Sequence, residues 1–219
     1  MPKTISEIYT EYKIMPSLQM HMLRVAAVAS LICDNFEEPL PKEDIITACL
    51  LHDMGNIIKS DLMLFPDFRE PEGLPYWQGV KDEYVKKYGQ NEHKATVLIL
   101  HELGLGKNFI EIIDHVDFKL SCIIQENDSL IYRIVNYADW RVDPFGVVSY
   151  EHRMEEGKRR YENSNRTFGG VDETERLRLV GCGKEIEKQI FAKCKIKPED
   201  ITDETVASVI EELRNFVVK

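Results

Sequence analysis

Apolar residues recur three or four positions apart along most of this 219-residue chain. Such spacing places them on one face of a helix, whereas a strand requires alternation of apolar and polar residues. Alternating stretches bounded by turn residues are scarce here. In the segment that begins at Pro16, for example, one helical face carries His21, Val25, Val28 and Ile32. The pattern predicts an all-α protein.

Capping residues, prolines and glycines set the expected helix boundaries. The predicted helices cover residues 16–33, 41–58, 92–103, 108–115, 128–141, 151–161, 173–194 and a last segment after Asp203, whose apolar stripe is Val206, Val209, Ile210, Leu213 and Val217. Residues 59–79 contain three prolines and two glycines, which excludes a long helix and predicts an ordered loop. We expect one domain, with a core over about residues 17–145 and a helical appendage over about 146–219.

The chain carries 38 acidic and 28 basic side chains, a net charge of −10. This charge repels nucleic acid polymers and anionic membranes, so we expect neither as a partner. A small phosphorylated substrate fits if a metal ion or nearby cations reverse the potential inside a cleft. The sequence shows no export signal and no long apolar run, and its five cysteines include no CxxC pair. Reduced thiols and a cytoplasmic location follow as expectations.

The segment ACLLHDMGNIIKS, residues 48–60, places His52 and Asp53 side by side in an apolar helix. Burying an imidazole and a carboxylate without partners would cost on the order of several kcal/mol. A divalent cation would satisfy both groups at once. His21 also lies on an apolar face, where a lone histidine is more often a core residue with one hydrogen bond than a ligand. The neighbouring pair favours the ligand interpretation.

Three further histidines lie in the middle of the chain. His93 and His101 fall on one predicted helix, eight residues or about 12 Å apart, so only one of them can join a compact site. His93 lies in the first turn of that helix and His101 near its far end. His115 ends the following helix. Asp139 lies on an apolar helix face, where a carboxylate also requires a partner.

Six potential ligands thus follow one another as His21, His52, Asp53, His93, His115 and Asp139. This order resembles the His, His-Asp, His, His, Asp pattern of the HD-domain superfamily of metal-dependent phosphohydrolases. The flanking segments over residues 17–145 are similar as well, in HMLRVAAVASLI, ACLLHDMGN, HKATVLILHELGLGKNFIEIIDHV and YADWRV. The resemblance implies a helical bundle with one metal ion held by His21, His52, Asp53 and Asp139. In two-metal members a second ion would be held by His93 and His115, with Asp53 as the bridge.

Two ions in such a site would hydrolyse a phosphoester or phosphoanhydride through a metal-bound hydroxide. The expected substrate is a nucleotide or another small phosphorylated metabolite. Imidazole and carboxylate ligands suit divalent transition metals. Iron or manganese is favoured, while zinc, nickel, cobalt and magnesium stay open.

The predicted catalytic and substrate-binding residues are Asp53, Arg24, Lys94, Asn56 and Arg141. Each cation has a structural alternative. Arg24 is at least equally suited to a salt bridge between helices. Lys94 is also suited to a solvated surface position. Arg141 lies two residues after Asp139, so it points away from the site unless the helix that carries Asp139 ends before it. Asn56 stands where many two-metal members carry a lysine.

Two other functions are compatible with the same ligands. Some HD-fold proteins with these six residues house a di-iron centre and oxidise substrates with dioxygen. A non-catalytic metal or nucleotide sensor would instead use the carboxyl-terminal helices as a partner surface. Oxygen consumption would favour the first, and nucleotide binding without phosphate release the second. Assembly into a homo-oligomer also stays open.

Overall fold

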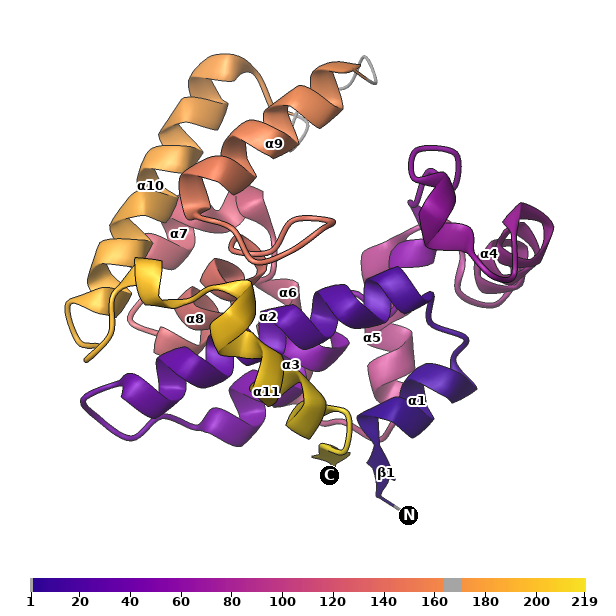
Figure 1. Ribbon diagram of the computed structural model, residues 1–219, viewed down its shortest axis with the longest axis horizontal. Helices are drawn as coiled ribbons and strands as arrows, with labels where there is room; N and C mark the ends of the chain where they lie inside the picture. Colours follow the sequence, from indigo (N-terminus) through magenta and orange to yellow (C-terminus); the bar gives the residue numbers. More distant parts are fainter. Residues whose placement is uncertain (1, 164–170) are drawn as a thin grey trace.

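The computed structural model describes residues 2–163 and 171–219, and it confirms the predicted all-α class (Figure 1). The helices are α1 (Ile5–Glu11), α2 (Pro16–Asn35), α3 (Lys42–Leu51), α4 (Leu74–Tyr88), α5 (Glu92–Glu102), α6 (Lys107–Asp114), α7 (Ser121–Glu126), α8 (Leu130–Asp139), α9 (Tyr150–Asn163), α10 (Glu173–Phe191) and α11 (Asp203–Leu213). Short 3-10 helices are η1 (Asn56–Ile58), η2 (Pro66–Arg69), η3 (Phe118–Leu120) and η5 (Pro198–Asp200). Two strands, β1 (Lys3–Thr4) and β2 (Val217–Val218), pair antiparallel and bring the two ends of the chain together.

The long helix α2 is central to the bundle and packs against α3, α8 and α11. Its middle is fully buried, as at Met22, Val25 and Val28. Among the described helices, α2 is the one long and apolar enough to cross a membrane by length and composition. Half of that apolar stretch is buried inside the protein, so core packing accounts for its composition. The helix predicted over residues 16–33 is confirmed, with its end at Asn35.

The helix predicted over residues 41–58 was wrong in its extent. α3 ends at Leu51, and the chain then turns before entering η1. Gly55 lies in this turn against the first turn of α5, where an added Cβ would lie 2.3 Å from the Glu92 carbonyl oxygen. The Gly55 N–H also donates to Thr96 Oγ1 at 2.9 Å. His52 and Asp53 therefore follow the end of a helix instead of lying inside one.

The loop predicted over residues 59–79 is also shorter than expected. α4 begins at Leu74 with Pro75 in its first turn, where the missing proline N–H would have had no partner within the helix. Residues 59–73 form the irregular segment, which includes η2. Proline was taken as a helix breaker where it instead starts a helix.

The helices that carry the later histidines and Asp139 agree closely with prediction. Asn91 caps α5 by accepting the Lys94 N–H at 2.8 Å, and Gly104 closes it with a φ of +80°. α6 starts one residue before Asn108, with Gly106 as its cap. α8 ends at Asp139, two residues before the predicted limit.

The helices after residue 146 are integral to the bundle. α10 packs against α7 and α8, and α11 packs against α2. Leu179, Ile186 and Val206 are completely buried. Their apolar stripes contribute to the shared core, while the division into a core over about residues 17–145 and an appendage over about 146–219 stays a prediction. Of the stripe predicted for the last helix, Val206, Ile210 and Leu213 are buried, whereas Val217 lies outside α11, in β2.

The segment between the helices predicted over residues 151–161 and 173–194 is described as far as Asn163, where α9 ends, and residues 164–170 lie outside the described residues.

A disulfide joins Cys122 in α7 to Cys182 in α10, across the contact between these helices. The expectation of uniformly reduced thiols is wrong for this pair, because the two side chains are distant in sequence but adjacent in the fold. Cys33, Cys49 and Cys194 are free thiols. The cytoplasmic location stays a prediction.

Candidate metal centre

Four predicted ligands converge where α2, the end of α3 and the end of α8 meet. His21 comes from α2, His52 and Asp53 from the turn after α3, and Asp139 from the last residue of α8. The Asp139 Oδ1 atom lies 3.1 Å from His21 Nε2 and 3.5 Å from His52 Nε2. The Asp53 Oδ2 atom lies 3.8 Å and 3.7 Å from the same two nitrogens. Both carboxylates thus face both imidazoles.

The orientation of His52 fits a metal ligand. Its Nδ1 atom lies 2.8 Å from the Cys49 carbonyl oxygen, which fixes the ring and directs Nε2 toward the two carboxylates. The buried Nε2 atom has no hydrogen-bond partner. A buried polar atom in that state requires an explanation, and coordination of an ion supplies one. Two imidazoles with two carboxylates form a donor set that suits a divalent transition metal.

The electrostatics of these groups point the same way. Burial alone would lower the pKa of His52, but the Asp53 and Asp139 carboxylates outweigh burial and raise this pKa to about 9. Burial would raise the pKa of Asp139, yet His21 and His52 hold it well below its usual range. Both pKa shifts reflect the attraction between the imidazoles and the carboxylates. The carboxylates therefore favour positive charge at this centre, which either a proton or a metal ion provides.

Asn56, predicted to contact substrate, contacts the predicted ligand Asp53. Its Nδ2 group donates to Asp53 Oδ2 at 2.7 Å. This hydrogen bond holds the carboxylate in one orientation from the first residue of η1. The side chain therefore acts on the position of Asp53, and a contact with phosphate stays a prediction.

The second predicted pair of ligands lies at the facing ends of α5 and α6. His93 is in the first turn of α5, which Gly55 contacts, and its Nε2 atom lies 2.8 Å from Asp114 Oδ1. His115 directly follows that aspartate in the chain, as the residue that ends α6.

The His115 ring is held by two contacts. Its Nδ1 atom lies 2.7 Å from the Glu111 carbonyl oxygen, and the ring stacks on Tyr132 with centroids 4.1 Å apart. Neither His93 nor His115 belongs to the group of three potential ligands whose donor atoms lie within 4.8 Å of one another in the described residues, which is His21, His52 and Asp53. A second ion therefore stays a prediction.

The predicted cations have different surroundings. Arg24 forms the anticipated salt bridge, with Nε 3.8 Å from Asp203 Oδ1 at the start of α11. Lys94 has an exposed side chain, as the surface alternative predicted.

Arg141 is 3% exposed and donates to the Tyr137 hydroxyl at 2.7 Å and to the carbonyl oxygens of Val148, Pro198 and Ile201 at 2.5–3.1 Å. Because its guanidinium ties α8 to the segment before α11, we do not assign Arg141 to the site.

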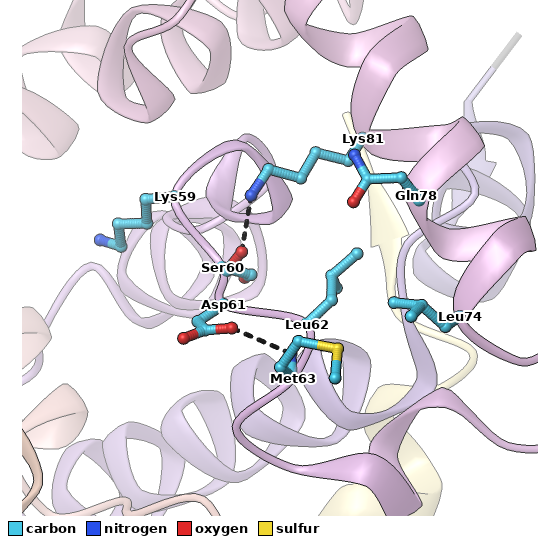
Figure 2. Close-up of a pocket in the computed structure, with 8 residues that line it drawn as sticks. All are labelled: Lys59, Ser60, Asp61, Leu62, Met63, Leu74, Gln78 and Lys81. Carbon is cyan, nitrogen blue, oxygen red and sulfur yellow. Dashed lines mark hydrogen bonds between the residues drawn. The ribbon is translucent and has the colours of Figure 1, made fainter. Parts of the chain in front are cut away.

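A small cavity of about 320 Å³ lies beyond the His52–Asp53 turn, between residues 59–63 and α4. Figure 2 shows Lys81 reaching across it to donate to the Ser60 carbonyl oxygen at 2.7 Å, while the Lys59 ammonium points away from Lys81. Lys59 instead lies 3.5 Å from Glu92 at the start of α5. Both lysines thus link the segment after Asp53 to neighbouring helices.

Sequence reasoning missed several residues that contact the predicted site residues. Asp114 could have been noticed, because it is an acidic neighbour of a predicted ligand. The Cys49 carbonyl and Asp203 carry no signal in the sequence, since their roles depend on the turn after α3 and on the packing of α11 against α2.

The helical bundle gathers two histidines and two aspartates at one partly buried centre, and this donor set is typical of a divalent transition-metal site. Its sequence matches the family model described as HD domain over residues 19–180, more than two thirds of the chain, and the chain belongs to the HD-domain family. The match continues past residue 145 through α9 and into α10. No curated protein and no solved structure matches the chain. The family places the protein in a superfamily of metal-dependent hydrolases.

Proposed function

We propose that this protein is a metal-dependent phosphohydrolase that cleaves a phosphoester or phosphoanhydride of a nucleotide or another small phosphorylated metabolite. The observation that carries the proposal is the convergence of two imidazoles and two carboxylates, with the buried Nε2 atom of His52 facing both carboxylates and making no hydrogen bond. The membership of the HD-domain family supports it.

In this proposal the first ion is held by His21, His52, Asp53 and Asp139. A divalent ion there would polarise a phosphoryl oxygen and lower the pKa of water, which is the chemistry that hydrolysis requires. The protein contributes orientation: Cys49 fixes the His52 ring and Asn56 fixes the Asp53 carboxylate. With a net charge of −10, the chain also needs local positive charge to admit an anionic substrate.

A second ion would be held by His93 and His115, with Asp53 as the shared ligand. The support is the contact of Gly55 with the first turn of α5, which links the chain just after Asp53 to the helix that carries His93. Lys94 in the same turn has an exposed side chain that is suited to a phosphate oxygen. Arg24 lies one helical turn from His21 and would serve the same purpose if substrate competes with Asp203 for it.

Elemental analysis of the purified protein, together with phosphate release from a panel of nucleotides and sugar phosphates, tests the proposal. We expect bound transition metal and phosphate release in the wild type, and loss of both in His52→Ala. His93→Ala should lose one ion if two are bound. His101→Ala is the matched control, because His101 is an exposed residue at the far end of the same helix α5 and should leave metal content unchanged.

Two outcomes would replace the proposal. Iron-loaded protein that consumes dioxygen and releases no phosphate would identify the oxygenase alternative. Metal-loaded protein that binds nucleotides tightly without hydrolysing any member of the panel would identify a sensor.

A further inference from the structure

Three phenylalanines form a cluster outside the apolar core of the described residues. The centroid of the Phe145 ring lies 5.7 Å from that of Phe65 and 5.8 Å from that of Phe68, and the latter two centroids are 4.9 Å apart. Phe145 is 66% exposed, although burial of an aromatic ring of this size is strongly favourable. Core packing therefore does not explain this cluster.

The cluster is where two chain segments that leave the metal centre meet again. Phe65 and Phe68 lie on the segment that follows Asp53, at and within η2. Phe145 lies on the loop that follows Asp139, between α8 and α9. In Figure 1 this loop points toward the segment before α4, and the ring contacts join the two. The rings therefore connect the two segments that begin at the carboxylate ligands.

The loop that carries Phe145 is held firmly in place. The buried Asp143 carboxylate accepts the N–H groups of Phe145 and Gly146 at 2.7 Å and 2.8 Å. Asp203 at the start of α11 accepts the Val147 N–H at 3.0 Å. The same Asp203 pairs with Arg24, one helical turn from His21 on α2. One carboxylate thus ties the Phe145 loop to the helix of a metal ligand.

The opposite side of the cluster is anchored as well. The indole N–H of Trp77 in α4 donates to the Arg69 carbonyl oxygen at the end of η2, at 3.1 Å. Trp77 itself is 3% exposed. The three rings therefore lie on two segments that hydrogen bonds hold in place. Because these segments are already ordered, the protein loses less conformational entropy when a flat group binds to the rings.

We propose that Phe65, Phe68 and Phe145 form a platform that binds the nucleobase of a nucleotide substrate whose phosphate is at the metal centre. This inference rests on the proposed function and narrows its substrate class from phosphorylated metabolites in general to those that carry an aromatic base. Exposed aromatic faces bind bases by stacking, and stacking accepts any base because every base has a π-face. The platform therefore selects for the presence of a base and discriminates weakly among bases.

Titration calorimetry with paired ligands tests the platform without depending on hydrolysis. The ligands are the phosphonate analogues of four nucleoside monophosphates and of ribose 5-phosphate, in which a carbon–phosphorus bond resists cleavage. The last ligand has the same sugar and the same anionic group but no base. We expect the manganese-loaded protein to bind at least one nucleotide analogue about five-fold or more tightly than the ribose analogue.

Phe145→Ala should abolish this preference by weakening only the nucleotide analogues. Because Phe145 is largely exposed, its loss should not alter the circular dichroism spectrum of the protein. Leu98→Ala is the matched control, since Leu98 is an exposed apolar residue on α5 and should keep the wild-type preference.

Equal binding of all analogues, a preference that survives Phe145→Ala, or no binding of any analogue would each overturn the platform. These results are distinct from failure of the proposed function. A base preference that depends on Phe145, without phosphate release from any substrate, would remove the hydrolase and leave the platform. Phosphate release without a base preference would support the hydrolase and remove the platform.

Discussion

Asn56 holds a proposed metal ligand through one hydrogen bond, from its amide to Asp53 Oδ2. Asn56→Ala leaves the Asp53 carboxylate free to rotate. Loss of a hydrogen-bond partner of a metal ligand typically weakens metal binding about ten- to 100-fold. We expect a loss of that size in a manganese titration of the purified protein. Asn108→Ala, at an exposed position of α6, should bind manganese as the wild type does.

Gly55 allows the turn after Asp53 to lie directly against α5. In Gly55→Ala the new methyl group would lie 2.3 Å from the Glu92 carbonyl oxygen and 2.8 Å from Ala95 Cβ, so the backbone must shift. We expect a loss of about 1–3 kcal/mol in the free energy of unfolding, measured by urea denaturation.

A matched substitution has the opposite expected effect. Gly79→Ala meets nothing within 4 Å inside α4, and it should stabilise the protein by about 0.5–1 kcal/mol because alanine favours a helix. Equal effects of the two substitutions would contradict the role given to Gly55.

Candidate site residues could be predicted where the signal lies in neighbouring positions of the sequence. His52 and Asp53 stand out as polar neighbours in an apolar segment, and the structure places them together with His21 and Asp139. The partners of the arginines were not predictable. Arg24 and Arg141 pair with groups near residue 200, and spacing along a helix carries no information about such distant contacts.

Among the elements, α10 offers a direct comparison of buried and exposed leucines. Leu179 is completely buried, whereas Leu177, two residues earlier, is 56% exposed. We expect Leu179→Ala to lower the free energy of unfolding by about 2–5 kcal/mol, because it opens a cavity in the core. Leu177→Ala should change it by less than about 0.5 kcal/mol in the same denaturation experiment. Similar small effects would mean that α10 is dispensable for the fold.

Helix boundaries were predictable where a capping residue acts within its own helix. Asn91 marks the start of α5 and Gly104 its end, as the structure confirms. The end of α3 could not be predicted, because the turn at Gly55 depends on contact with α5. The start of α4 was missed because proline breaks a helix interior but is also favoured in the first turn of a helix, which is where Pro75 lies.

At the scale of the molecule, the carboxyl-terminal third joins the core through few apolar residues. α9 and α10 are rich in charged side chains. Their sparse apolar positions, such as Met154 and Ile186, are nevertheless buried, and the disulfide between Cys122 and Cys182 fastens α10 to α7. A few apolar residues at helical spacing were enough to make these helices part of one core.

The placement of the candidate ligands on α2, after α3 and at the end of α8 couples ion binding to folding. These three helices pack on one another, and an unfolded chain would not hold the four side chains together. An ion that binds only the folded protein stabilises it by about 2.7 kcal/mol when its free concentration is 100 times its dissociation constant. The thermal midpoint should therefore rise with the logarithm of ion concentration, and His52→Ala should remove the rise. Ranking iron, manganese, zinc, nickel, cobalt and magnesium by this rise would turn the melting temperature into a gauge of metal preference.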